Sequence, residues 1–155
     1  VYTPSAPDIY GAFNELSIGS VGAMGCSRAG NFVVQNADYV LVLGSRLTAL
    51  TTGTDYCKFA RCAQVTVVDI DPVELKEAII EPDMKICTDL KIFFNSFKKF
   101  PIKKFKNQTW VEQCSEFKKF KYLNNLTVGS KEVNPYLFFN IFCSFIYISI
   151  YLFNF

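Results

Sequence analysis

The sequence predicts an α/β fold of Rossmann-like type, in which a parallel sheet is flanked by helices. Two apolar runs, Tyr39–Leu43 and the run from Gln64 that ends in the acids Asp69 and Asp71, resemble strands buried on both faces of a parallel sheet. A glycine-bearing loop and a helical apolar pattern precede the first run. Strands that alternate with helices along one chain are typical of this fold class.

The N-terminal part predicts a strand remnant, a loop and a helix. Val1–Thr3 is short and extended, and we interpret it as the remainder of a first strand cut by the start of the chain. Residues 5–15 hold Pro, Gly, Asn and Asp and predict a loop. Glycines recur at every third residue over Gly19–Gly25, and apolar residues then follow at helical spacing as far as Ala37.

The remaining elements follow in the same alternation. A polar turn at Thr51–Thr54 and a short helical stretch at Tyr56–Arg61 lead into the second strand. A helical turn over Val73–Ile79, a short edge strand at Lys85–Cys87 and an amphipathic helix from Asp89 to Phe97 are expected after it.

The composition excludes several kinds of chemistry. The 155 residues contain no histidine, so Ser-His-Asp and Cys-His nucleophiles, histidine-ligated metals and histidine acid–base catalysis are excluded for this chain. The six cysteines form no C-x-x-C pair, so we predict no metal site from them. We interpret them as reduced, packed thiols of an intracellular protein.

Charge and aromatic content divide the chain near residue 92. Residues 1–92 carry seven basic and eleven acidic side chains, whereas residues 93–155 carry nine and three and hold thirteen of the 16 phenylalanines. We interpret the lysines and aromatics of residues 98–121 as a solvated face over buried rings, and we expect no nucleic-acid binding. Residues 137–155 carry no charge, but their polar and aromatic content makes a membrane anchor the weaker interpretation.

Three features are expected to meet at the carboxyl ends of the strands, where parallel sheets bind ligands. They are the glycine loop, the segment Gly44–Arg46, and the acids Asp69 and Asp71. Glycines let backbone N–H groups approach a phosphate, Arg46 can pair with a phosphate, and an acid at a strand end can accept hydrogen bonds from a ribose. The alternatives stay open: the glycines can be structural, an acid can cap a helix, and Arg46 can form an internal ion pair.

A family resemblance supports the nucleotide interpretation. The block Gly19–Asp38, the block Tyr39–Leu47 and the block Val67–Pro72 resemble, in order and spacing, the central domain of thiamine-diphosphate-dependent enzymes. This group includes acetolactate synthase, pyruvate oxidase and benzoylformate decarboxylase, and its central domain has a DHS-like NAD/FAD-binding fold. Trp110 and Cys114 resemble the family's linker helix, and Val133–Tyr136 resembles the entry to its third domain.

The resemblance implies which residues lie near a bound nucleotide. Some members hold FAD in the central domain, some hold ADP, and others leave the site empty. The positions of this sequence that match the family's site are Gly22, Gly44, Arg46, Asp69, Ile70 and Asp89. The sequence departs from the family at Thr88, where a glycine often precedes the acid matching Asp89.

The resemblance also implies what this chain lacks. In the family, a glutamate of the first domain activates thiamine diphosphate, and a Gly-Asp-Gly…Asn motif of the third domain holds its diphosphate through Mg²⁺. Neither is present here, so we expect no catalytic residue, no metal ligand and no activity from residues 1–155 alone. The implied parent is an acetolactate synthase-like carboligase or decarboxylase (a transferase or lyase) acting on 2-oxo acids or 2-hydroxyacyl compounds. The alternative is a non-catalytic nucleotide-binding or structural module, whereas a sirtuin-like deacylase is rejected because its histidine and Cys₄ zinc site are missing.

The expected organisation has three parts. Residues 1–97 are the central domain with an incomplete N-terminus, residues 98–132 a linker with a helix, and residues 133–155 the start of a third domain followed by an apolar tail, which we interpret as a gene-model or intron artefact beyond Asn140. The parent is expected to be a homodimer or homotetramer in the cytoplasm, or in an organelle if a targeting segment precedes Val1. An incomplete sheet leaves an unpaired edge and an uncovered face, which predicts poor stability of the isolated chain.

Overall fold

The structure is a computed structural model that describes residues 1–11, 14–24, 26–101, 107–119, 138 and 141–142. The chain divides into two compact units, Val1–Lys119 and Phe120–Phe155. The expected start of a third domain at residues 133–136 lies outside the described residues, as does most of the apolar stretch after it. Across the described ranges, no helix is both long enough and apolar enough to cross a membrane.

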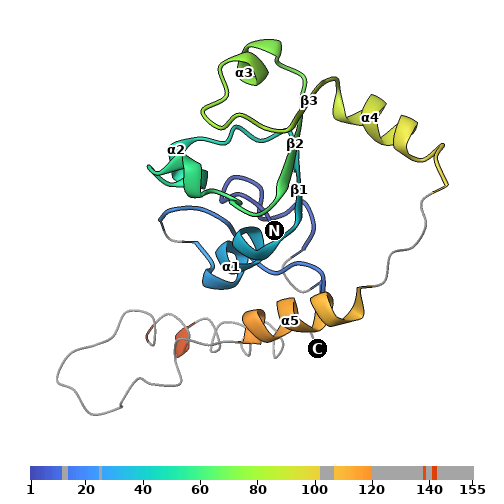
Figure 1. Ribbon diagram of the computed structural model, residues 1–155. Coiled ribbons are helices and arrows are strands. Elements are labelled where there is room, and N and C mark those ends of the chain that lie inside the picture. The colour runs from blue at the N-terminus through green and yellow to red at the C-terminus, as the bar shows by residue number, and fades with distance from the viewer. Residues whose placement is uncertain (12–13, 25, 102–106, 120–137, 139–140, 143–155) are drawn as a thin grey trace. The chain divides into compact units, whose positions relative to one another are not determined.

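Three parallel strands form the sheet of the first unit. They are β1 (Tyr39–Leu43), β2 (Gln64–Asp69) and β3 (Met84–Cys87), in that spatial order (Figure 1). Leu43 lies opposite Val68, and Asp69 lies opposite Cys87, so the carboxyl ends of all three strands meet at one edge. The α/β class with a parallel sheet is therefore confirmed. Tyr2 makes an isolated parallel bridge to Ser20, outside this sheet.

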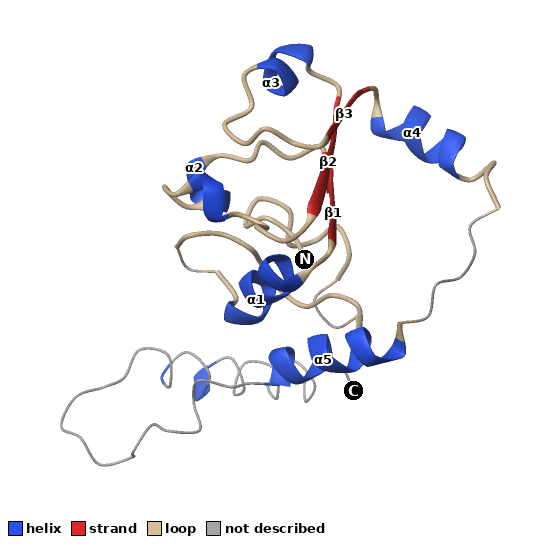
Figure 2. Ribbon diagram, in the orientation of Figure 1, coloured by secondary structure: helices blue, strands red, loops and turns tan. Residues whose placement is uncertain are grey.

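Helices alternate with the strands, as predicted. Their bounds are α1 (Arg28–Asn36), α2 (Ala49–Thr52), the 3₁₀ turn η1 (Tyr56–Lys58), α3 (Pro72–Lys76), α4 (Leu90–Phe97) and α5 (Gln108–Lys119). Figure 2 shows the sheet almost edge-on, with α2 and α3 on one side and α4 on the other. The sequence predicted only a turn where α2 lies, because four residues are too few for a hydrophobic period to emerge.

Three of the helices begin where a short polar side chain can cap them. The Ser27 hydroxyl accepts a hydrogen bond from Gly30 N–H at the start of α1, and the Asp71 carboxylate accepts one from Val73 N–H at the start of α3. Asp89 accepts from Lys91 N–H at 2.7 Å and so starts α4. Each cap satisfies a backbone donor that the first helical turn leaves without an internal partner.

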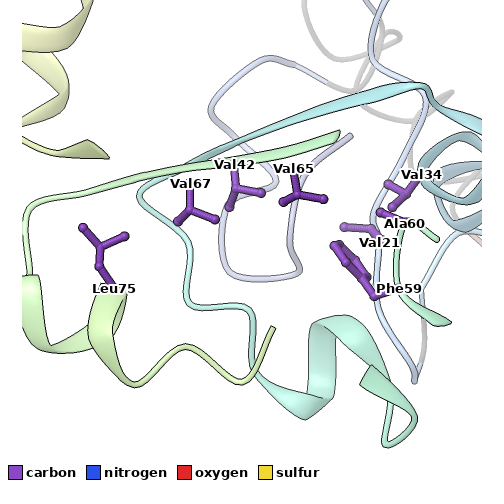
Figure 3. Close-up of a cluster of buried hydrophobic side chains, with 8 residues drawn as sticks. All are labelled: Val21, Val34, Val42, Phe59, Ala60, Val65, Val67 and Leu75. Carbon is purple, nitrogen blue, oxygen red and sulfur yellow. The ribbon is translucent and has the colours of Figure 1, made fainter. Parts of the chain in front are cut away.

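The main hydrophobic core covers one face of the sheet. Figure 3 shows Val42, Val65 and Val67 in a row along β1 and β2, with Leu75 of α3 beyond one end of the row. At the other end lie Val21, Val34, Phe59 and Ala60. Residues two apart on a strand point to the same face, and parallel partners in register share that face. The residues of one face thus hold the glycine loop, α1 and α3 against the strands.

The prediction that Tyr39–Leu43 is buried on both faces is wrong. Tyr39 is 52% exposed and Leu41 is 37% exposed, whereas Val42 between them is buried. β1 is an edge of the three-stranded sheet, and no residue of α4 is buried. The β2 residues on the same face, Thr66 and Val68, are buried, so this face is covered there and exposed at the edge strand β1.

A second, smaller cluster joins α5 to α1. Ile18, Ala29 and Cys114 are buried there, and the rings of Phe32 and Phe117 stack at 5.4 Å between centroids. The structure has a helix, α5, in the segment where a linker helix was predicted, and Cys114 is buried on it. The cysteines described by the structure, Cys26, Cys57, Cys62, Cys87 and Cys114, are all free thiols.

Candidate nucleotide site

A cavity of about 230 Å³ lies at the carboxyl ends of β1 and β2. The segment after β1 contributes Ser45–Thr48, β2 contributes Val67 and Asp69, and the α3 region contributes Val73–Leu75 and Glu77–Ile79. Val67 and Leu75 also belong to the main core, so the floor of the cavity is fixed by core packing. The cavity lies where an open parallel sheet leaves room for a ligand.

An ion pair spans two sides of this cavity. Arg46 Nε lies 3.0 Å from Glu74 Oε1, and the two side chains are 67% and 35% exposed. A pair this exposed adds little to the stability of the fold. Within the described part of the chain, this guanidinium is paired only through Nε, so its Nη groups can bind a phosphate.

Asp69 is held by the turn that follows β2. Its Oδ1 accepts a hydrogen bond from Asp71 N–H at 2.9 Å. Among the described residues, none donates a hydrogen bond to Oδ2, and Asp69 lines the cavity. Asp69 therefore has an oxygen that can accept a ligand hydroxyl, while Asp71 is used by the cap of α3.

The local sequence explains why Glu74 faces Arg46. Glu74 is the third residue after the cap Asp71, the position at which a glutamate usually bonds back to the N–H of the capping residue. Here that N–H is already bonded to Asp69, so the Glu74 carboxylate is left to pair with Arg46. The D-x-x-E spacing was visible in the sequence, but our sequence analysis did not single out Glu74 or Glu77, which also lines the cavity.

Gly22 belongs to a different cavity, of about 210 Å³. Its N–H donates to Asn31 Oδ1 at 2.9 Å, and its carbonyl accepts from Asn31 Nδ2 at 2.8 Å. The next N–H, of Ala23, donates to the carbonyl of Leu50 at 2.7 Å. Two N–H donors of the glycine loop, those of Gly22 and Ala23, are thus bonded within the protein.

The other three predicted residues line neither cavity. Gly44 has a φ of +56° and donates its N–H to Val68, so it turns the chain at the end of β1. Ile70 is 66% exposed, and the Asp89 carboxylate caps α4. Of the six residues matched by the resemblance, only Arg46 and Asp69 line the first cavity.

The donor set of the first cavity suits the nucleoside end of a nucleotide. A free carboxylate oxygen accepts ribose hydroxyls, and a partly exposed guanidinium at the rim can hold a phosphate. Within the described part of the chain, no group of three or more His, Cys, Asp or Glu residues could hold a metal ion. Asp69 and Arg46 could therefore contact the ribose and a phosphate of a nucleotide.

Residues 1–97 match the protein family described as the thiamine pyrophosphate enzyme, central domain. The chain is 36% identical to an acetolactate synthase large subunit from Cyanidium caldarium over 134 residues, which are 81% of this chain and 22% of that protein. It is 30% identical to a probable acetolactate synthase large subunit from Methanocaldococcus jannaschii over 135 residues, 83% of this chain and 22% of that protein.

A plant relative matches a shorter segment. A probable chloroplastic acetolactate synthase 2 from Oryza sativa subsp. japonica is 40% identical over 79 residues, which are 51% of this chain and 12% of that protein. The chain thus spans about a fifth of the length of the curated relatives that it matches over most of its own length.

Proposed function

Since the chain belongs to the family of thiamine pyrophosphate enzyme central domains, we propose that it is the nucleotide-binding or structural middle part of an acetolactate synthase-like enzyme. Residues 1–97 form the central domain, residues 98–132 a linker that carries α5, and residues 133–155 the start of the next domain followed by an apolar tail. The domain on its own has no catalytic residue, because the thiamine-activating groups lie in other domains of such enzymes.

The whole enzyme uses thiamine diphosphate and Mg²⁺ and acts on 2-oxo acids or 2-hydroxyacyl compounds, as a carboligase or a decarboxylase. Thiamine diphosphate supplies the carbanion chemistry in these enzymes, and the central domain supports the domains that bind it. The enzyme is a homodimer or homotetramer. Its location is the cytoplasm or an organelle, and a curated relative is described as chloroplastic.

The cofactor of the central domain itself is FAD or ADP, bound at the cavity between Arg46 and Asp69. The observation that carries this proposal is Asp69 Oδ2, which accepts no hydrogen bond from the described residues and lies in a cavity of about 230 Å³ at the carboxyl ends of two parallel strands. Asp69 accepts the ribose hydroxyls, and Arg46 holds a phosphate at the rim through its Nη groups.

Titration of the purified 155-residue chain tests the proposal. FAD binding is followed by quenching of flavin fluorescence, and ADP binding by isothermal titration calorimetry. Saturable binding of either ligand with a stoichiometry near one supports the proposal, and no binding of either overturns it.

A pair of aspartates in the same turn gives a matched control. Asp69→Asn weakens binding on the order of tenfold, because a carboxylate that accepts ribose hydrogen bonds becomes neutral. Asp71→Asn makes the same change two residues away, at the cap of α3, and leaves the affinity within about twofold because Asn is also a good cap. Equal losses in the two variants would contradict the assignment of Asp69.

The second candidate is a module that binds no nucleotide and only supports the fold. The observation that favours it is the glycine loop, whose N–H donors at Gly22 and Ala23 are already bonded to the protein. A full-length gene product that is catalytically active, with this chain's segment free of nucleotide, would establish it.

A further inference from the structure

The lining of the cavity at the ends of β1 and β2 carries an excess of negative charge. Asp69, Glu74 and Glu77 line it together with one cation, Arg46. The Arg46 guanidinium already faces the Glu74 carboxylate, at 3.0 Å between Nε and Oε1. The lining therefore has three carboxylates for one guanidinium, and that guanidinium is shared.

This charge distribution affects a phosphate on the ribose 2′ or 3′ oxygen differently from a 5′-phosphate chain. Hydroxyls of an unmodified ribose donate hydrogen bonds to carboxylates, whereas a phosphate on the same ribose brings further negative charge among them. Arg46 is 67% exposed, so a 5′-phosphate chain that leaves the cavity along it is also surrounded by water and ions. A phosphate on the 2′ or 3′ oxygen would instead lie beside the carboxylate of Asp69, which accepts the ribose hydroxyls in the proposed site.

From this arrangement we infer that the cavity selects adenine nucleotides whose ribose 2′- and 3′-hydroxyls are free, and rejects those with a ribose phosphate. Glu74 and Glu77 are the specificity-determining residues. Glu74 acts in two ways, since it adds negative charge and keeps Arg46 from turning toward a ribose phosphate. This inference rests on the proposed function, because it concerns the same nucleotide site.

Three isomers test the inference. ADP, adenosine 2′,5′-bisphosphate and adenosine 3′,5′-bisphosphate contain the same atoms, but the second phosphate forms an anhydride in ADP and a monoester on the ribose in the two bisphosphates, which also carry a higher negative charge near pH 7. Each is titrated calorimetrically into the full 155-residue chain at one fixed ionic strength, since salt screens the effect. ADP is expected to bind on the order of tenfold more tightly than either bisphosphate.

Charge-neutralising variants identify the cause. Glu74→Gln and Glu77→Gln are each expected to reduce the ratio of the affinity for ADP to the affinity for the bisphosphates severalfold. Glu81→Gln is the matched control: it also removes one carboxylate, but Glu81 pairs with Lys85 at 2.9 Å and does not line the cavity, so this ratio stays as in the parent chain. Circular dichroism of each variant is the check that it is folded.

The outcomes separate the two proposals. Equal affinity for the three isomers overturns the selectivity and leaves the proposed function standing. A preference for ADP that Glu74→Gln and Glu77→Gln leave unchanged overturns the role of these two residues. If none of the isomers binds and FAD does not bind either, both the proposed function and the selectivity are overturned.

Discussion

The side-chain amide of Asn31 holds the backbone of Gly22 at both its N–H and its carbonyl group, at 2.9 and 2.8 Å. Asn31 lies in the first turn of α1, so the two bonds fix the glycine loop to that helix. Both bonds are partly buried, which limits how well water can replace them. One side chain, nine residues further along the chain, thus holds the loop at Gly22.

Asn31→Ala is expected to destabilise the fold by about 1–3 kcal/mol, because both polar groups of Gly22 lose their partners. Urea unfolding followed by circular dichroism measures the loss. Asn36→Ala, in the last turn of the same helix, removes only an exposed bond to the Phe32 carbonyl and is expected to cost no more than about 0.5 kcal/mol. Similar losses for both variants would show that the Asn31 bonds do not hold the loop.

The sequence predicts the main elements of this fold because they depend on local patterns. The limits of β1 and the presence of β2, α1 and α4 follow from hydrophobic runs and periodicity. Asp71 and Asp89 stand directly before apolar helical segments, and the structure shows both as caps. Such signals come from residues within a few positions of one another.

The parts that escaped prediction depend on tertiary contacts. The Arg46–Glu74 pair joins residues 28 positions apart, and no periodicity relates them. The exposure of Tyr39 and Leu41 depends on which other segments pack on the edge strand. An apolar run predicts that a strand can be buried, but it does not predict which of its residues are covered. Which residues line one cavity likewise depends on how the loops pack, and of the predicted set only Arg46 and Asp69 line the first cavity.

Gly30 is expected to tolerate no side chain. A Cβ on this residue would lie 2.9 Å from the carbonyl carbon of Ser20, and closer still to its oxygen. Helix propensity alone predicts that Gly30→Ala would stabilise α1 by about 1 kcal/mol. Because backbone must shift to admit the methyl group, we expect instead a net loss of about 1–3 kcal/mol.

The sign of the Gly30→Ala effect, measured by chemical denaturation, decides between these two physical terms. Gly30→Val should cost more than Gly30→Ala, since a larger group meets the same carbonyl. A Gly30→Ala variant that is more stable than the parent chain would show that the close packing of α1 on Ser20 is not maintained in solution.

The two faces of β1 should respond differently to truncation. Val42→Ala removes a buried methyl pair from the main core and is expected to cost about 2 kcal/mol. Leu41→Ala, one residue away on the exposed face, is expected to cost less than about 1 kcal/mol although it removes more carbon atoms. Thermal or urea unfolding of the two variants compares them directly.

The same exposed face bears on self-association. Leu41→Lys is expected to fold and to reduce concentration-dependent association of the chain, as measured by light scattering, because a charge on an open edge strand opposes strand pairing. A Leu41→Lys variant that unfolds would mean that this face is covered in solution.

Cys114 should be the least reactive of the described thiols and should make stability depend on alkaline pH. It is 5% exposed, whereas Cys57 and Cys62 are exposed, so an aromatic disulfide reagent should label those two long before Cys114.

Burial raises the pKa of the Cys114 thiol, which means that the folded chain holds this proton more tightly than the unfolded chain does. The stabilisation from this residue is therefore fully present below the unfolded thiol pKa, about 8.5, and is lost as the pH rises through the higher folded value. Urea midpoints measured from pH 7.5 to 10 should fall for the parent chain and fall less for Cys114→Ala, and identical slopes would mean that the thiol is not buried in solution.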